Sequence, residues 1–148
     1  MRMARVPLNQ IEVHAGFGAR GTDRPLPDLL VAEGAHDLVS FLRPPLLIPS
    51  PGENGGYLAI GNVRVLEWRK RIADCAETPD TDMLSLIIDA VDFDVAALAC
   101  TERYLLPLVL GLLSKREERE ARRELKIAGH TRLDRTPIRA RLAPIRRQ

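Results

Sequence analysis

The chain has 148 residues, a formal net charge of +2 and 45% apolar residues. That length favours one domain with an ordinary hydrophobic core. No stretch approaches the ~18 continuous apolar residues of a membrane-spanning helix, and the start of the chain lacks the apolar core of a signal peptide. Cys75 and Cys100 are too few and too far apart for a disulfide scaffold or a zinc site of the usual spacing. We therefore expect a cytoplasmic protein.

Hydrophobic periodicity and turn residues predict a chain of mixed α/β type. The 83–91 run is almost continuously apolar, which is typical of a central strand covered on both faces. Pro107 interrupts an apolar helical pattern, and we expect it to start a new helix rather than to kink one long helix. The predicted elements are a strand at 5–13, a helix at 26–42, strands at 45–50 and 56–60, a helix at 62–76, a strand at 83–91, and helices at 93–104 and 106–126.

The stretch from Gly56 to Arg69 is the most informative, because an apolar strand ends at Gly61 and a helix begins at once. A helix N-terminus offers unpaired N–H groups and a partial positive charge, which together favour a phosphate. Gly61 allows close approach of the backbone, Asn62 is a good N-cap, and Arg64 adds a forked charged donor. The alternative is an ordinary turn and cap with Arg64 solvated, since the spacing is not that of a P-loop or a dinucleotide fingerprint.

Charge is distributed unevenly along the chain. Residues 1–114 contain 10 Lys/Arg and 15 Asp/Glu, whereas residues 115–148 contain 12 and 5. We therefore divide the chain into a domain at 1–114 and a basic C-terminal helix and tail at 115–148. The tail suits contacts with the DNA phosphate backbone without base readout, the alternatives being a solvated tail or one that binds an acidic protein. Its candidate DNA-binding residues are Arg132, Arg135, Arg139, Arg141, Arg146 and Arg147.

The histidines suggest no metal chemistry. His14, His36 and His130 are scattered through different predicted elements, with no partner at metal-ligand spacing. We interpret them as structural or solvated residues and assign no protein residue as a metal ligand.

The order of these motifs resembles the ParB/sulfiredoxin superfamily, in particular the N-terminal domain of ParB partition proteins, over about residues 4–113. Residues 6–13 resemble the opening strand of that family, and Arg20 stands where the family has a short motif ending in Pro-Arg. Residues 43–49, Arg-Pro-Pro-Leu-Leu-Ile-Pro, resemble its next turn and strand. The resemblance implies an α/β (α+β) fold in which a small mixed sheet packs with helices, followed here by the basic extension.

Two further motifs concern the site. Gly61-Asn62-Val63-Arg64 stands where ParB proteins have Gly-Glu-Arg-Arg and sulfiredoxins have Gly-Cys-His-Arg. Asn62 replaces the reactive cysteine, so sulfinic-acid reductase activity is not expected, and Val63 replaces one ParB arginine. Residues 92–106 resemble the helix of the ParB box, Glu-Asn-x-x-Arg, with Thr101-Glu102-Arg103 supplying the matching residue types.

The resemblance implies a nucleotide site for ATP or CTP with Mg²⁺. Its phosphate-binding residues would be Arg20, Gly61, Asn62, Arg64 and Arg103, and its catalytic residues Arg64, Glu67 and Glu102. One of the two carboxylates would position water for attack.

The chain is too short for the helix-turn-helix and dimerisation domains of complete ParB proteins, so it resembles stand-alone members found on plasmids and other mobile elements. This favours a metal-dependent DNase with ATP or CTP hydrolysis acting on plasmid or conjugative DNA. The alternative is a non-catalytic DNA-binding or protein-interaction accessory in partition, regulation or inhibition of conjugation. A third possibility is a protein that acts on a partition or secretion apparatus through its basic tail.

Overall fold

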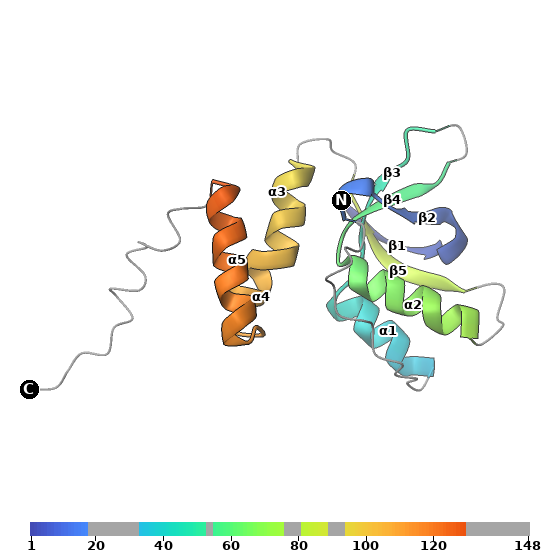
Figure 1. Cartoon of the computed structure of the whole chain (residues 1–148). Helices are drawn as coiled ribbons and strands as arrows, with labels where there is room; N and C mark the ends of the chain where they lie inside the picture. Colours follow the sequence, from blue (N-terminus) through green and yellow to red (C-terminus); the bar gives the residue numbers. More distant parts are fainter. Residues whose placement is uncertain (18–32, 53–54, 76–80, 89–93, 130–148) are drawn as a thin grey trace, which may run out of the picture. The chain divides into compact units, whose positions relative to one another are not determined.

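The structure, a computed structural model, describes residues 1–17, 33–52, 55–75, 81–88 and 94–129. These residues belong to two compact units, Met1–Ala99 and Cys100–Gln148 (Figure 1). The predicted boundary after residue 114 was placed where the net charge changes sign. The two compact units instead divide between Ala99 and Cys100, within a helix.

The first unit is built on a five-stranded mixed sheet, which confirms the predicted α/β class. The strand order is β1-β5-β3-β4-β2, with antiparallel pairing in β1/β5 and β3/β4 and parallel pairing in β5/β3 and β4/β2. β5 thus lies inside the sheet, as its apolar sequence predicts. The strands are β1 (Arg2–Pro7), β2 (Ile11–Val13), β3 (Leu46–Pro49), β4 (Tyr57–Gly61) and β5 (Asp82–Ile87).

The predicted single strand at 5–13 is wrong. A 3₁₀ turn at Leu8–Gln10 divides it, and the two resulting strands, β1 and β2, lie at opposite edges of the sheet. Pro7 ends β1 and has no N–H to continue a ladder, while the N–H of Leu8 donates to the carbonyl of Thr81 at 3.0 Å. Apolar residues alternate with others on both sides of Asn9 and Gln10, so the sequence reads as one strand although its alternation shifts by one position at these two residues.

Helix α2 (Val63–Cys75) packs on the sheet and closes the main core. Val63 and Leu66 are buried with Leu47, Ala59 and Met83, which come from three strands. Lys70 on the same helix donates through Nζ to the carbonyl of Ile11. These contacts fix the direction in which α2 leaves β4. The remaining members of the buried cluster are Val6, Leu8, Ile11 and Ile87.

Helix α1 (Glu33–Leu42) contacts α2 and β5. The rings of His36 and Trp68 meet edge to face, with centroids 5.7 Å apart. Arg5 on β1 also contacts α1, because its guanidinium donates to Asp37 of that helix at 2.8 Å. The same guanidinium donates to Asp82 on β5 at 3.0 Å. The N-terminal part of the predicted helix 26–42, residues 26–32, lies outside the described residues.

The second unit begins at Cys100, the last residue of helix α3 (Val95–Cys100), and its described part is helical. The helix continues through a π-helical turn, η3 (Thr101–Leu105), into α4 (Leu106–Val109), and α5 (Lys115–Ile127) follows. In η3 the N–H of Leu106 bonds to the carbonyl of Thr101, five residues earlier. Pro107 comes next, and its ring cannot accept ordinary helical geometry against the carbonyl four residues before it. We attribute the widened turn to this clash.

The predicted helix 106–126 is also wrong as one element. Pro107 lies in the first turn of α4, but α4 follows η3 without a break instead of starting a separate helix as predicted, and it ends at Val109. Gly111 has φ +66°, a left-handed conformation that favours glycine, and the chain turns there before α5 begins. α5 packs on η3 and buries Ala121 and Leu125. Burial raises the pKa of the Cys100 thiol, with a smaller contribution from Glu124.

The other predicted elements are present with small shifts of their ends. β5 ends at Ile87 rather than at 91, and residues 89–91 lie outside the described residues. Within the described ranges, no helix combines the length and the apolar character that crossing a bilayer requires.

Candidate phosphate-binding site at the β4–α2 junction

The junction between β4 and α2 forms where the sequence predicts it. β4 ends at Gly61, Asn62 forms the link, and α2 begins at Val63. Gly61 is buried, and a Cβ atom built on it would lie 2.6 Å from Cδ1 and 2.8 Å from Cγ of Leu46. The absence of a side chain at Gly61 therefore allows close packing against β3. This contact is a structural reason for the glycine that the sequence did not indicate.

Asn62 has a left-handed backbone, with φ 52°, and among the described residues it is the one non-glycine residue with positive φ. Its side-chain amide donates to the carbonyl oxygen of Pro44 at 2.8 Å, and its own carbonyl accepts from the N–H of Val65 at 3.1 Å. Asparagine tolerates this conformation better than most residues. Asn62 thus ties the start of α2 to the segment that leads into β3.

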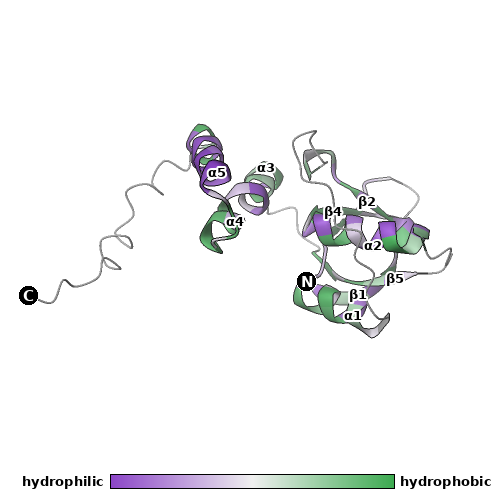
Figure 2. Ribbon diagram, turned by 60° about the horizontal axis from the view of Figure 1, so that its bottom comes forward, coloured by the Kyte–Doolittle hydropathy of each residue, from purple (hydrophilic) through white to green (hydrophobic). Residues whose placement is uncertain are grey.

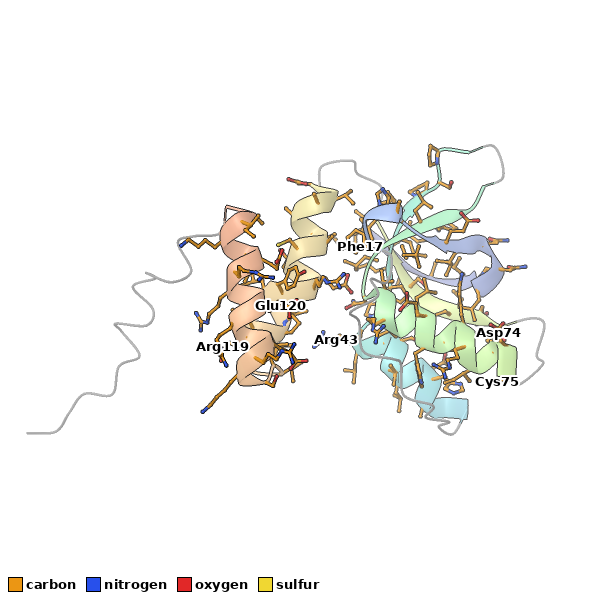
Figure 3. The ribbon with its side chains drawn as sticks, viewed as in Figure 1. Phe17, Arg43, Asp74, Cys75, Arg119 and Glu120 are labelled. Atoms are coloured by element: carbon orange, nitrogen blue, oxygen red, sulfur yellow. The ribbon has the colours of Figure 1, made fainter. Side chains whose placement is uncertain are left out.

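Arg64 lies in the first turn of α2 with a side chain that is 46% exposed, and its Nη1 is 3.6 Å from Oε2 of Glu67. The predicted phosphate-binding arginine and one predicted carboxylate are therefore neighbours. The solvent-facing stripe of α2 continues with Arg71 and Asp74, so positive and negative residues alternate along it. Figure 3 labels Asp74 and Cys75 at the end of this helix.

Val63 explains a departure from the ParB pattern, which has an arginine at this position. Its side chain is only 4% exposed and belongs to the core cluster with Leu66. An arginine here would place a charge among apolar side chains. The start of α2 therefore presents one arginine, Arg64, where the motif of the family has two.

The other predicted site residues lie in the second unit or outside the described residues. Glu102 and Arg103 belong to the π-helical turn of the second unit, where the Arg103 guanidinium lies 5.7 Å from the ring centroid of Tyr104. Arg20 lies outside the described residues, and so do all six predicted DNA-binding arginines, Arg132, Arg135, Arg139, Arg141, Arg146 and Arg147.

The histidines in the described ranges have structural surroundings. Nδ1 of His14 accepts from the N–H of Gly16 at 3.0 Å, and His36 contacts the ring of Trp68. His130 lies outside these ranges. Among the described residues, no group of three or more His, Cys, Asp or Glu side chains could hold a metal ion.

Sequence reasoning missed the residues that support the junction. Pro44 accepts the Asn62 hydrogen bond and Leu46 fills the space beside Gly61. Both belong to the segment 43–49 that resembles the ParB family, but nothing in the linear sequence pairs that segment with residues 61–62. The antiparallel register of β3 and β4, in which Leu46 faces Gly61, is what brings them together.

No protein-family model matches the sequence, and no curated protein is similar to it. Solved structures that match include C-terminally truncated chromosome-partitioning protein ParB from Caulobacter crescentus. In its complex with the centromeric parS site, the identity is 18% and the TM-score 0.44, covering 84% of this chain and 56% of the ParB chain. In its complex with CTP-γ-S, the identity is 15% and the TM-score 0.40, covering 74% and 61%. This chain thus spans little more than half of those ParB chains, which belong to the superfamily that its motifs resemble.

Proposed function

We propose that the chain binds a nucleoside triphosphate and DNA, with the phosphates of the nucleotide at the β4–α2 junction. The observation that supports the proposal most is the position of Arg64, partly exposed in the first turn of a helix that begins directly after a buried glycine. The helix dipole, the amides of the first turn and a guanidinium then favour the same anion. The solved ParB complexes with CTP-γ-S and with parS DNA make CTP and DNA the ligands to test first, and the sequence resemblance adds ATP.

We further propose, from the sequence resemblance, that the activity is that of a DNase coupled to ATP or CTP hydrolysis on plasmid or conjugative DNA. In this proposal Arg64 holds a phosphoryl group and Glu67, its neighbour at 3.6 Å, orients a water molecule. Glu102 and Arg103 remain predictions from the sequence, because they belong to the second unit. The described residues offer no cluster of metal ligands, so we assign Mg²⁺ no protein ligands and no step.

The test is to measure binding of labelled ATP and CTP, their hydrolysis, and nicking of supercoiled plasmid by the purified chain. Arg64→Ala removes a charge-assisted contact worth ~1.5–3 kcal/mol, so nucleotide affinity should fall by roughly 10- to 150-fold. Nicking and hydrolysis should fall with it.

Arg71→Ala is the matched control. Arg71 is also exposed on α2, and its substitution removes the same charge. It lies seven residues after Arg64, which is about 10 Å along the helix at 1.5 Å per residue. Its nucleotide affinity should stay close to that of the unchanged protein. An equal loss of nucleotide affinity in both variants would mean that the total positive charge of α2, and not the position of Arg64, determines binding. Absence of nucleotide binding by the unchanged chain would refute the proposal.

A second candidate is a non-catalytic accessory that binds DNA or a partition or secretion protein through its basic C-terminal region. The pairing of Arg64 with Glu67 and the alternating charges along α2 favour it, because they are also what a solvated helix face shows. In that case Arg64→Ala leaves DNA binding unchanged, and deletion of residues 127–148 abolishes most of it. A salt-sensitive pull-down of protein that persists after nuclease treatment would instead identify a protein partner.

A further inference from the structure

The basic residues of helix α5 are mostly exposed, whereas most of its acidic residues are partly buried. Its sequence mixes acidic and basic residues, and Figure 2 shows it as a largely hydrophilic helix. Its exposed charged residues are nevertheless five cations and one carboxylate: Lys115, Arg116, Arg119, Arg123, Lys126 and Glu120. We call the five cations the α5 cationic face. Arg119 and Glu120 are labelled in Figure 3.

The remaining acidic residues of α5 are half-buried and have local roles. Glu117 forms a capping box with Ser114, accepting from its N–H at 2.8 Å. Glu118 accepts from Arg122 at 2.9 Å. Glu124 pairs at 3.2 Å with Arg123, whose side chain stays 69% exposed. Three of the four carboxylates of α5 are therefore only partly exposed and have partners within the helix or its cap, so cations predominate on its exposed surface.

The cationic face runs along the whole helix. At 1.5 Å per residue, Lys115 and Lys126 are ~16 Å apart, and Arg116, Arg119 and Arg123 follow one another at helical spacings of three and four residues. Over the same distance a DNA duplex presents about ten phosphate charges. We propose that the α5 cationic face binds the phosphate backbone of double-stranded DNA without base readout.

Two other partners are less consistent with the distribution of residues. The apolar side of α5, at Ala121 and Leu125, is buried within the second unit, so it is not available to a lipid surface. Exposed large apolar residues lie at the two ends of α5: Val109, Leu110 and Leu112 surround the turn before it, and Ile127 is its last residue. Cations along the full length, with the exposed apolar residues at the two ends of the helix, fit a long polyanion better than a membrane or a compact acidic protein.

This inference rests on the proposed DNA binding and makes it more specific, because it assigns part of the affinity to a folded helix rather than to the arginines of residues 132–147. It does not depend on the nucleotide site at the β4–α2 junction. The two proposals can therefore fail separately.

The test uses the full chain and a fluorescent duplex of arbitrary sequence, with the dissociation constant measured from 50 to 200 mM salt. The variant combines Arg116→Gln, Arg119→Gln and Arg123→Gln, since glutamine is a good helix former. Each lost phosphate contact should reduce the slope of log affinity against log salt by ~0.9, so the slope should fall by about 2.7. Glu120→Gln should tighten binding, because it removes the one carboxylate among the exposed residues of α5.

The matched control combines Arg2→Gln, Arg43→Gln and Arg71→Gln. These substitutions replace three exposed arginines of the first unit and remove the same total charge. Its salt slope should stay unchanged, and circular dichroism should show native helix content in both triple variants. An unchanged slope in the α5 variant, or equal losses in the two variants, would overturn the inference. So would tight binding to anionic vesicles that depends on Leu110 and Leu112, with no binding to the duplex. α5-dependent DNA binding without nucleotide binding would support the inference and refute the nucleotide proposal alone.

Discussion

The side-chain amide of Asn62 donates a 2.8 Å hydrogen bond to the carbonyl oxygen of Pro44. This bond joins the first residue before α2 to the segment before β3, across eighteen positions of sequence. Asn62 also holds a left-handed backbone, with φ 52°. The side chain and the backbone of one residue therefore both determine how α2 begins, and with it the position of Arg64.

Substitutions at Asn62 should separate these two roles. Asn62→Gly removes the hydrogen bond but accepts the backbone, so the free energy of unfolding should fall by ~0.5–1.5 kcal/mol. Asn62→Ala removes the bond and also strains the backbone, which adds ~1–2 kcal/mol. Urea denaturation of the two variants gives the difference directly. Equal stabilities for Ala and Gly would mean that position 62 does not keep its left-handed backbone.

Gly61 should tolerate a side chain only when Leu46 is made smaller. Gly61→Ala places a methyl group 2.6 Å from Cδ1 of Leu46 and should cost ~1–3 kcal/mol of unfolding free energy through overpacking. Leu46→Ala alone should be destabilising as well. In the double variant the clash disappears, so the combined loss should be smaller than the sum of the two. Additive losses in the double-mutant cycle would show that Leu46 is not what excludes the methyl group.

The start of α2 could be predicted from the sequence because its signals are local. A strand-forming run, a glycine and an amphipathic helix follow one another within residues 56–76, and β4 and α2 lie within one residue of the predicted ends. The supports of the junction could not be predicted, because Pro44 and Leu46 reach it through strand pairing. Register is set by packing of the whole sheet, and a single sequence does not specify it.

The two incorrect elements have the same physical origin. In both segments, 5–13 and 106–126, residues of the same predicted class stand on the two sides of the break, while the breaks depend on backbone features of one or two residues. Pro7 removes a donor at the end of β1, and Gly111 reverses the chain with a positive φ. Prolines and glycines were visible in the sequence, but their effect on topology, such as placing β1 and β2 at opposite edges, follows only from the folded sheet.

The contacts of Arg5 should make stability depend on pH in the acidic range. The hydrogen bond from Arg5 is the main reason that the pKa of Asp37 lies below its usual value. A lowered pKa in the folded state means that the carboxylate stabilises the fold fully above the unfolded value of ~3.9, and that this contribution is lost as pH falls through the folded value. Arg5→Met should therefore unfold at a lower temperature than the unchanged protein at pH 7.

The difference between the two proteins should shrink as the pH falls through the lowered pKa of Asp37 and its carboxylate becomes protonated in the folded state as well. Melting curves from pH 2 to 7 measure it, and 1 M salt should reduce it at neutral pH because Arg5, Asp37 and Asp82 are about half exposed. A difference in melting temperature that is constant over this range would mean that Arg5 stabilises the fold through the packing of its stem and not through the ion pair.

The capping box at the start of α5 should contribute measurably to the second unit. The side chain of Ser114 accepts from the N–H of Glu117, and a Glu117 carboxylate oxygen accepts from the N–H of Ser114 at 2.8 Å. Ser114→Ala removes one half of this arrangement and should cost ~0.5–2 kcal/mol, whereas Ser114→Asp should retain most of the stability. The effect on the helix should be compared by circular dichroism during urea denaturation. Because α5 also carries the cationic face, Ser114→Ala should weaken DNA binding only under conditions where the helix begins to unfold. Weaker binding by a fully helical variant would argue that Ser114 itself contacts the DNA.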